Sequence, residues 1–207
     1  MKSIRQPLLG GLLAGLSIAI GGSVFLMVEN QVVGALLFSV GLFSVCVFGF
    51  SLFTGKVCYV FDNPPAFAKS LPFIWLGNLA GAVGFGLLLL LTRLEPQLTA
   101  RAAAVCEKKL SQSPLSAFVL AFCCDLLIYI AVEGYKTIPH EVGKYLAILF
   151  GVMVFILCGF EHCVANMFYF TVGRAWSLKA AAYLLLMTLG NAAGGVALPL
   201  LRKAFSR

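Results

Sequence analysis

Charged residues are scarce in this sequence. Only 11% of the 207 residues are Asp, Glu, Lys or Arg, whereas 61% are hydrophobic, and the mean hydropathy is +0.99. A soluble domain carries roughly 25% charged residues, so a chain this apolar cannot cover itself with polar surface in water. The composition excludes a soluble globular fold and indicates a lipid bilayer, in which a chain of this length provides about six helices of ~20 residues.

Metal-binding patterns are also missing. The two histidines lie far apart, and none of the seven cysteines forms a C-x-x-C pair. We therefore expect no metal ion and no cofactor, and we interpret the cysteines as small apolar packing residues. Cys106 is the exception, because it lies in a polar stretch that we expect to be a loop with an exposed thiol. The net charge of +7 is scattered along the chain, which favours a topology signal over nucleic-acid binding.

Hydropathy divides the chain into six apolar segments, at about residues 7–28, 32–61, 71–92, 114–133, 145–173 and 178–201. The first is too long for a cleavable signal sequence, so we interpret it as a span. Six spans place both termini on one side, and a weak excess of Lys and Arg on that side indicates that the termini are cytoplasmic. We expect a multi-pass protein of the cell membrane with a single transmembrane domain over residues 1–207.

The second and fifth segments are longer than a bilayer requires. Each holds about 30 residues, or ~45 Å of straight helix against a hydrocarbon core of ~30 Å. Each also contains polar residues: Thr54 and Lys56 in the second, and Glu161, His162 and Asn166 in the fifth. Such segments predict broken helices, whose irregular backbone is tolerated in a membrane only inside protein or beside a cavity.

An internal repeat links the two halves of the chain. GLFSVCVFGF at 41–50 matches GVMVFILCGF at 151–160, and GNLAG at 77–81 matches GNAAG at 190–194 at nearly the same offset. We interpret the chain as two repeats of three spans, about 7–92 and 114–201, with the second inverted because three is odd. A broken helix in each inverted repeat is typical of a transport site near the midplane. The two Gly-Asn-x-x-Gly stretches are small-residue faces for close helix packing.

Titratable side chains within spans are functional candidates, because they are costly to place in lipid. His162 lies at the expected break, where a neutral imidazole could donate a hydrogen bond to a passing anion and a protonated one could give it a proton. The Thr54 hydroxyl could bond a permeant ion or His162. We expect Glu161 to point elsewhere and to hold the broken backbone. A histidine bonded within the bundle and a threonine bonded to its own helix remain alternatives.

These residues resemble the formate/nitrite transporter family. The resemblance rests on GFEHCVANM at 159–167, which is specific, on the shorter LFTG at 52–55 and on the two Gly-Asn-x-x-Gly stretches, and it covers essentially the whole chain. It implies an all-α membrane protein and a homopentamer of aquaporin-like protomers, each with six helices of which the second and fifth are broken. Each protomer would be one channel domain for a small monovalent weak-acid anion such as formate, nitrite or hydrosulfide.

The resemblance also implies roles for individual residues. His162 would be the central pore histidine, Thr54 its partner, and Lys109 a basic residue at the outer mouth that concentrates anions. Two hydrophobic constrictions are implied, an inner one of Leu42, Phe53 and Ile128 and an outer one of Phe38 and Phe155. A weak acid that takes up a proton would cross these constrictions as a neutral molecule. The structural polar residues would be Glu161, Asp125, Lys56 and Asn166.

The sequence departs from the family pattern at three positions. Ser51 replaces an acidic residue, Lys56 an often uncharged one, and Asp125 the usual asparagine. We hypothesise that Lys56 neutralises Asp125 or Glu161 inside the protomer. The alternative is that Lys56 extends to the cytoplasmic surface.

Other functions fit the residues less well. An aquaporin-type channel for neutral solutes would need two Asn-Pro-Ala boxes, and the chain has one Asn-Pro-Pro at 63–65. A membrane enzyme would need a nucleophile with a base, and Cys163 is only the sequence neighbour of His162. A proton-coupled anion symporter on the same fold stays open. The expected partners are a small anion, the lipid bilayer and further copies of the chain, without nucleic acid.

Overall fold

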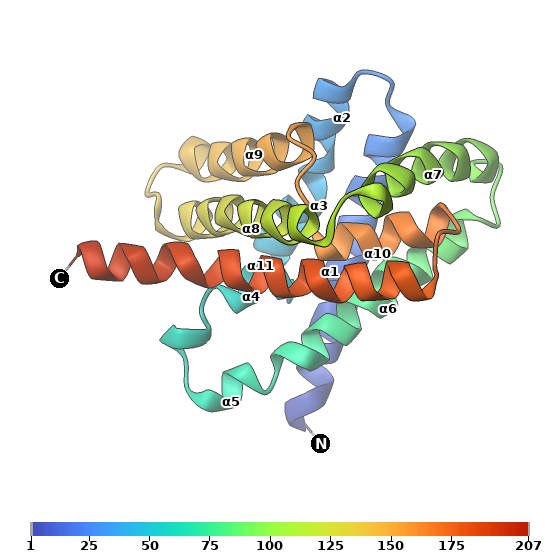
Figure 1. Ribbon diagram of the computed structural model, residues 1–207. Helices are drawn as coiled ribbons and strands as arrows, with labels where there is room; N and C mark the ends of the chain where they lie inside the picture. The colour runs from blue at the N-terminus through green and yellow to red at the C-terminus, as the bar shows by residue number, and fades with distance from the viewer. Residues whose placement is uncertain (1, 207) are drawn as a thin grey trace.

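The computed structural model describes residues 2–206, so Met1 and Arg207 of the expected domain lie outside it. The described chain is all-helical, as predicted, with no strand (Figure 1). The elements are α1 (Lys2–Met27), α2 (Gln31–Phe38), α3 (Val40–Phe48), α4 (Phe53–Val57), the 3-10 helix η1 (Val60–Asp62), α5 (Pro65–Ala68), α6 (Leu71–Leu89), α7 (Glu95–Ser111), α8 (Pro114–Thr137), α9 (Glu141–Leu157), α10 (Cys163–Val172) and α11 (Leu178–Phe205).

Five helical stretches are long and apolar enough to cross a membrane. They are Ile4–Met27, Gln31–Phe48, Pro65–Leu89, Pro114–Thr137 and Leu178–Phe205. The remaining predicted segment, 145–173, is divided between α9 and the short apolar helix α10. Many large hydrophobic side chains on these helices are exposed, which is expected of surfaces that face lipid or neighbouring subunits rather than water.

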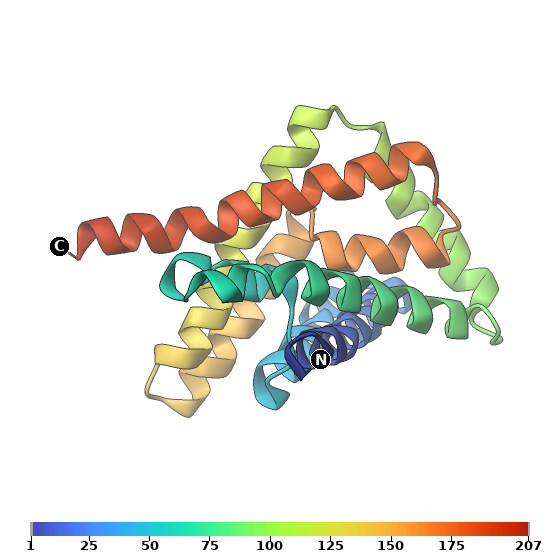
Figure 2. The ribbon, with the colours of Figure 1, turned by 90° about the horizontal axis from the view of Figure 1, so that it is seen from below.

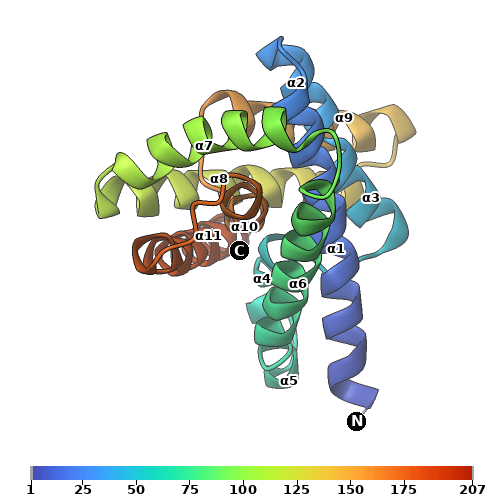
Figure 3. The ribbon, with the colours of Figure 1, turned by 90° about the vertical axis from the view of Figure 1, so that its right-hand side faces the viewer.

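Two helix pairs form the frame of the molecule. Helix α1 packs along α6, and α8 packs along α11, with α9 against the other side of α8. Helix α10 lies between α6 and α11 (Figure 2), and α7 crosses next to α10 (Figure 3). The short helices α4 and α10 are therefore enclosed by the two long pairs, where irregular backbone is shielded from lipid.

The Gly-Asn-x-x-Gly stretches bring each pair together. A Cβ atom on Gly81 of α6 would lie 2.0 Å from the Leu12 carbonyl oxygen of α1, and one on Gly194 of α11 would lie 2.0 Å from the Phe122 oxygen of α8. No real side chain tolerates such a distance, so only glycine allows these backbones to touch. The predicted packing role of the two stretches is confirmed.

Both predicted broken helices are present. Helix α3 ends at Gly49, whose φ is +70°, and the chain becomes helical again at Phe53. Helix α9 ends at Leu157, Gly159 has a φ of +68°, and α10 begins at Cys163. Glycine adopts this left-handed conformation without steric cost, which explains why a glycine stands at the same place in each break.

An asparagine holds the first break. The Asn78 side chain on α6 accepts a hydrogen bond from the Phe53 backbone N–H at 2.8 Å. Its amide nitrogen donates to the Ser51 carbonyl at 2.9 Å and to the Gly11 carbonyl of α1 at 2.8 Å. One buried side chain thus satisfies two backbone groups that the break would otherwise leave unpaired, and it also ties the break to the backbone of α1.

Asn191 on α11 does the same for the second break. It accepts a hydrogen bond from the Cys163 N–H at 2.9 Å and donates to the carbonyls of Glu161 and Ala121, both at 2.8 Å. These partners stand at the same places in the second half as those of Asn78 in the first. We had interpreted the asparagines only as part of a packing face, and their role as backbone anchors was missed.

Helix α7 was not predicted, and this corrects the expectation for Cys106. The stretch was expected to be a loop because it is polar, but its buried residues Leu98, Ala102 and Cys106 recur every four positions, which is the spacing of one helix face. Cys106 is buried against α10, and its thiol donates to the Tyr169 carbonyl at 3.3 Å. Burial raises the pKa of the Cys106 thiol to about 11. The exposed cysteine is Cys158.

Candidate functional site

His162 caps the amino end of α10. Its backbone is extended, and its ring Nδ1 accepts a hydrogen bond from the Ala165 N–H at 3.1 Å. A nitrogen that accepts from an N–H carries no proton itself, so the neutral ring carries its proton on Nε2. The cap therefore decides which edge of the imidazole faces the centre of the protein.

Thr54 meets that edge from the other broken helix. Its Oγ1 lies 3.0 Å from His162 Nε2, and both side chains are almost fully buried. Because Nε2 is the donor, Oγ1 accepts, and the hydroxyl proton of Thr54 stays available for another acceptor. The sequence predicted this encounter, and the structure brings the two residues together. The alternative in which Thr54 bonds its own helix is not what is found.

Aromatic rings close one side of His162. The Phe155 ring stacks on the imidazole with centroids 5.6 Å apart and planes at 20°, and the Phe38 ring meets Phe155 edge-on at 5.9 Å. These are the two residues expected in the outer constriction. Those expected in the inner constriction, Leu42, Phe53 and Ile128, are buried in the same hydrophobic core.

Glu161 points away from the imidazole and into a polar network on α7 and α10. Its carboxylate accepts from Lys109 Nζ at 2.6 Å, from Asn166 Nδ2 at 2.8 Å and from Gln112 Nε2 at 2.8 Å. The side chains of Glu161 and Lys109 are 2% and 13% exposed. A buried ion pair needs such extra hydrogen bonds to offset the loss of water.

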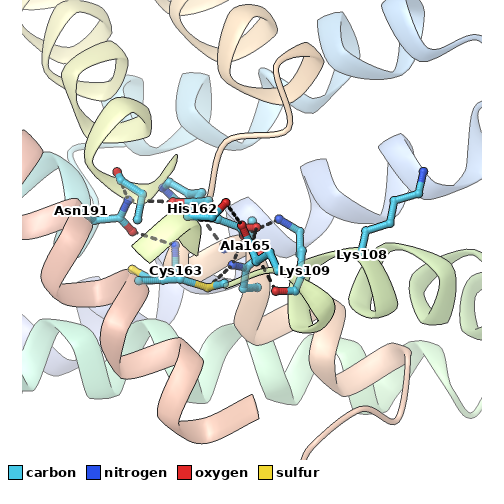
Figure 4. A network of polar contacts seen from close by, with 12 residues as sticks. Lys108, Lys109, His162, Cys163, Ala165 and Asn191 are labelled. Carbon is cyan, nitrogen blue, oxygen red and sulfur yellow. Dashed lines mark hydrogen bonds and ion pairs between the residues drawn. The ribbon is translucent and has the colours of Figure 1, made fainter. Parts of the chain in front are cut away.

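A cavity of about 410 Å³ opens next to this network. We call it the vestibule; its wall includes His162, Glu161, Asn166, Tyr169, Phe155, Lys108 and Lys109. Figure 4 shows the Lys109 ammonium group turned toward the cluster around His162, whereas Lys108 extends away along the same helix. Because Glu161 neutralises Lys109, the charge left over at the vestibule is that of Lys108, which favours anions.

The family model for the formate/nitrite transporter matches residues 1–204. The chain belongs to the formate/nitrite transporter family. It is 33% identical to YrhG, an uncharacterized transporter of Bacillus subtilis, over 81% of this chain and 72% of the relative. It is 32% identical to the nitrite transporter NirC of Salmonella typhimurium, over 82% and 68%.

Solved structures of the family have the same fold. A pentameric formate channel with formate bound superposes with a TM-score of 0.79, at 25% identity and over 94% of this chain and 93% of the other. An FNT family ion channel gives 0.79 at 26% identity, over 99% and 89%. The chain is accordingly a multi-pass membrane protein of a transporter and channel family rather than of an enzyme family.

Two of the departures from the family pattern now have a structural context. Glu161 pairs with Lys109, and within the described residues Lys56 forms no ion pair with Glu161 or Asp125, so the proposed pairing of Lys56 is wrong. The error arose because α7, which supplies the true partner, was taken for a loop. Asp125 is fully buried on α8 against Gly195, and neither of its carboxylate oxygens has a hydrogen-bond partner among the described residues.

Gln112 is the network residue that sequence reasoning did not find. It lies at the end of α7, and its side chain is held by Ser116 Oγ, which donates to its amide oxygen at 2.7 Å. Nothing near it in the sequence signals a buried carboxylate, because Glu161 comes from a distant part of the chain. Only the helical character of 95–111 could have indicated that Lys109 and Gln112 share one face, three positions apart.

Proposed function

We propose that the protein is a channel for small monovalent weak-acid anions, formate, nitrite or hydrosulfide, and that His162 assists protonation of the substrate in the pore. Membership of the family supports transport of this class. The observation that carries the finer proposal is the Thr54–His162 hydrogen bond, because it joins the two broken helices where an apolar constriction meets a polar vestibule.

The proposed passage uses the geometry of the two ring nitrogens. Lys108 draws the anion into the vestibule, and the apolar rings of Phe38 and Phe155 oppose entry of a bare ion. A proton arriving at His162 Nδ1 displaces the hydrogen bond from Ala165. When the imidazolium gives its Nε2 proton to the anion, that N–H bond breaks and the O–H or S–H bond of the acid forms. The neutral ring then carries its proton on Nδ1, and the hydrogen bond from Ala165 forms again only when this proton leaves Nδ1 and another returns to Nε2.

Beyond the histidine, the neutral acid would pass between Leu42, Phe53 and Ile128, which are apolar and buried. The Thr54 oxygen accepts from His162 Nε2, so the Thr54 hydroxyl proton is placed to donate to the substrate. Lys109 serves this pathway indirectly, by neutralising Glu161 so that the vestibule does not repel anions. Glu161 and Asn166 would hold the shape of the break.

We further propose that each protomer consists of two inverted repeats, about 7–92 and 114–201, within one channel domain of a homopentamer. The matching glycines of the breaks and the matching asparagine anchors support the repeat. A similar solved structure is a pentameric formate channel, which supports the assembly. The cytoplasmic side would hold both termini.

The test is uptake of formate, nitrite and hydrosulfide into proteoliposomes that contain the purified protein. At least one anion should enter far faster than into protein-free liposomes. Entry of water or glycerol without any of the three anions would contradict the proposal. Proton movement measured in parallel tests passage as the neutral acid, which, like the symporter alternative, carries one proton with each anion.

A further inference from the structure

Two buried polar atoms in the vestibule wall have no hydrogen-bond partner among the described residues. They are the side-chain oxygen of Asn166 and the hydroxyl of Tyr169. Both residues line the vestibule, and both belong to α10, three positions apart and therefore on one face of the helix. Buried polar groups are nearly always paired, so two unpaired atoms on the wall of one cavity require an explanation.

The orientation of Asn166 is fixed by its neighbour. The Glu161 carboxylate can only accept hydrogen bonds when it is paired with Lys109, so Asn166 must present its NH₂ group to it, as found at 2.8 Å. The Asn166 oxygen is then turned away from Glu161 and can only accept. Whatever satisfies it must bring a hydrogen-bond donor into the vestibule.

Tyr169 is held in place by its backbone and ring rather than by its hydroxyl. The Tyr169 carbonyl accepts from the Cys106 thiol, and the ring packs against Phe168 and alongside Gly22 of α1. Other tyrosines use their hydroxyls: that of Tyr59 donates to Glu133 and that of Tyr183 to the Gln112 carbonyl. The Tyr169 hydroxyl contributes nothing comparable to the fold.

We propose that Asn166 and Tyr169 form a substrate subsite of the vestibule that binds a small oxyacid in its protonated form. The Tyr169 hydroxyl donates to one oxygen of the acid, and the Asn166 oxygen accepts from the O–H of the acid. This inference rests on the proposed function and narrows it: formic and nitrous acid have both groups, whereas hydrogen sulfide has no oxygen to accept from Tyr169.

The surrounding charges agree with a protonated ligand. Titratable groups around the vestibule are Lys108, Lys109 and Glu161, with His162 at its inner end and the Cys106 thiol behind Tyr169. A bare anion at the subsite would place a negative oxygen against the Asn166 oxygen, next to the Glu161 carboxylate. The neutral acid avoids both repulsions, and it is also the product of proton transfer from His162.

The first arm of the test is uptake kinetics with Tyr169→Phe, which removes only the hydroxyl. The KM for formate and nitrite should rise about tenfold, the effect of one lost hydrogen bond of about 1.4 kcal/mol, and the KM for hydrosulfide should not change. Tyr59→Phe is the matched control, because it removes a tyrosine hydroxyl outside the vestibule and should leave every KM unchanged. An unchanged formate KM in Tyr169→Phe would overturn the subsite.

The second arm does not depend on transport. Formate should raise the melting temperature of the detergent-solubilised protein at pH 5, and Tyr169→Phe should abolish the shift. The apparent Kd in total formate should weaken about tenfold per pH unit between pH 5 and 7, since the protonated fraction falls by that factor. No shift in the wild type, or a Kd independent of pH, would overturn the subsite. A normal shift in a protein that transports no anion would instead refute the proposed function alone.

Discussion

The two broken helices share one construction and differ in chemistry. Each break begins with a left-handed glycine, and each is anchored by one asparagine that makes three hydrogen bonds to backbone groups. The side chains at the breaks are different: where the second has Glu161 and His162, the first has Ser51 and Leu52. The scaffold is duplicated, whereas titratable side chains occur at the break itself only in the second half.

This difference separates the residues that stabilise the fold from the residues that act on a substrate. Substitutions in the duplicated scaffold should have equal effects in both halves and should act on folding. Substitutions of the polar residues in the second break should also change transport. The first break has no equivalent polar residues whose substitution would do so. The predictions below test this division, beginning with the largest effect.

The asparagine anchors should be the most sensitive positions. Asn78→Ala and Asn191→Ala each leave two backbone groups of a break unpaired, at about 1–3 kcal/mol per group, and remove the bond to α1 or α8. A loss of at least about 2 kcal/mol lowers the melting temperature by roughly 4 °C or more. Thermal unfolding in detergent should show similar losses for the two variants. A large loss for only one would show that the breaks are not equivalent.

Lys109→Met should be nearly as damaging, because it leaves the Glu161 carboxylate buried without its cation. Breaking one side of a buried ion pair costs about 3–5 kcal/mol. Lys108→Met is the matched control, since Lys108 is exposed and points away from the network. Adding Glu161→Gln to Lys109→Met should recover part of the melting temperature. If Lys108→Met destabilises as much as Lys109→Met, the ion pair is not the cause.

The glycine contacts should give smaller and again symmetric effects. Gly81→Ala and Gly194→Ala force each helix pair apart, at about 1–3 kcal/mol each. Gly84→Ala lies on the same helix as Gly81, but its new Cβ would meet nothing within 4 Å. That variant should be unchanged or more stable by about 0.5–1 kcal/mol. Equal destabilisation by all three would show that the interhelical contacts of Gly81 and Gly194 are not the cause.

The smallest expected effect is an increase in stability. Asp125→Asn replaces a buried carboxylate that has no partner among the described residues with a neutral side chain of the same size. The melting temperature at pH 7 should rise, by about 2 °C or more for each kcal/mol recovered. Glu161→Gln, the matched change in a carboxylate with three donors, should lower it. A decrease for Asp125→Asn would reveal a partner for this carboxylate.

Much of the fold could be predicted from the sequence. The long apolar segments and the two breaks follow from segment length and polar interruptions, because these features are local. The Thr54–His162 encounter joins distant residues and was predicted from the resemblance to the family. The roles of Asn78 and Asn191 could not be predicted, since each bonds backbone carbonyls far away in sequence. Helix α7 was missed because an amphipathic helix that is polar on average gives no hydropathy signal. Lys109 lies on this helix, so its ion pair with Glu161 was missed as well.

The central claim is that His162 couples substrate protonation to passage through the pore. The direct test is the rate of formate uptake into proteoliposomes at saturating formate, from pH 5 to pH 8, for the wild type and His162→Asn. Asparagine can still cap α10, so the variant should fold. The account predicts a wild-type rate that rises as the pH falls and a variant rate that does not depend on pH. The same pH profile in both proteins would contradict it.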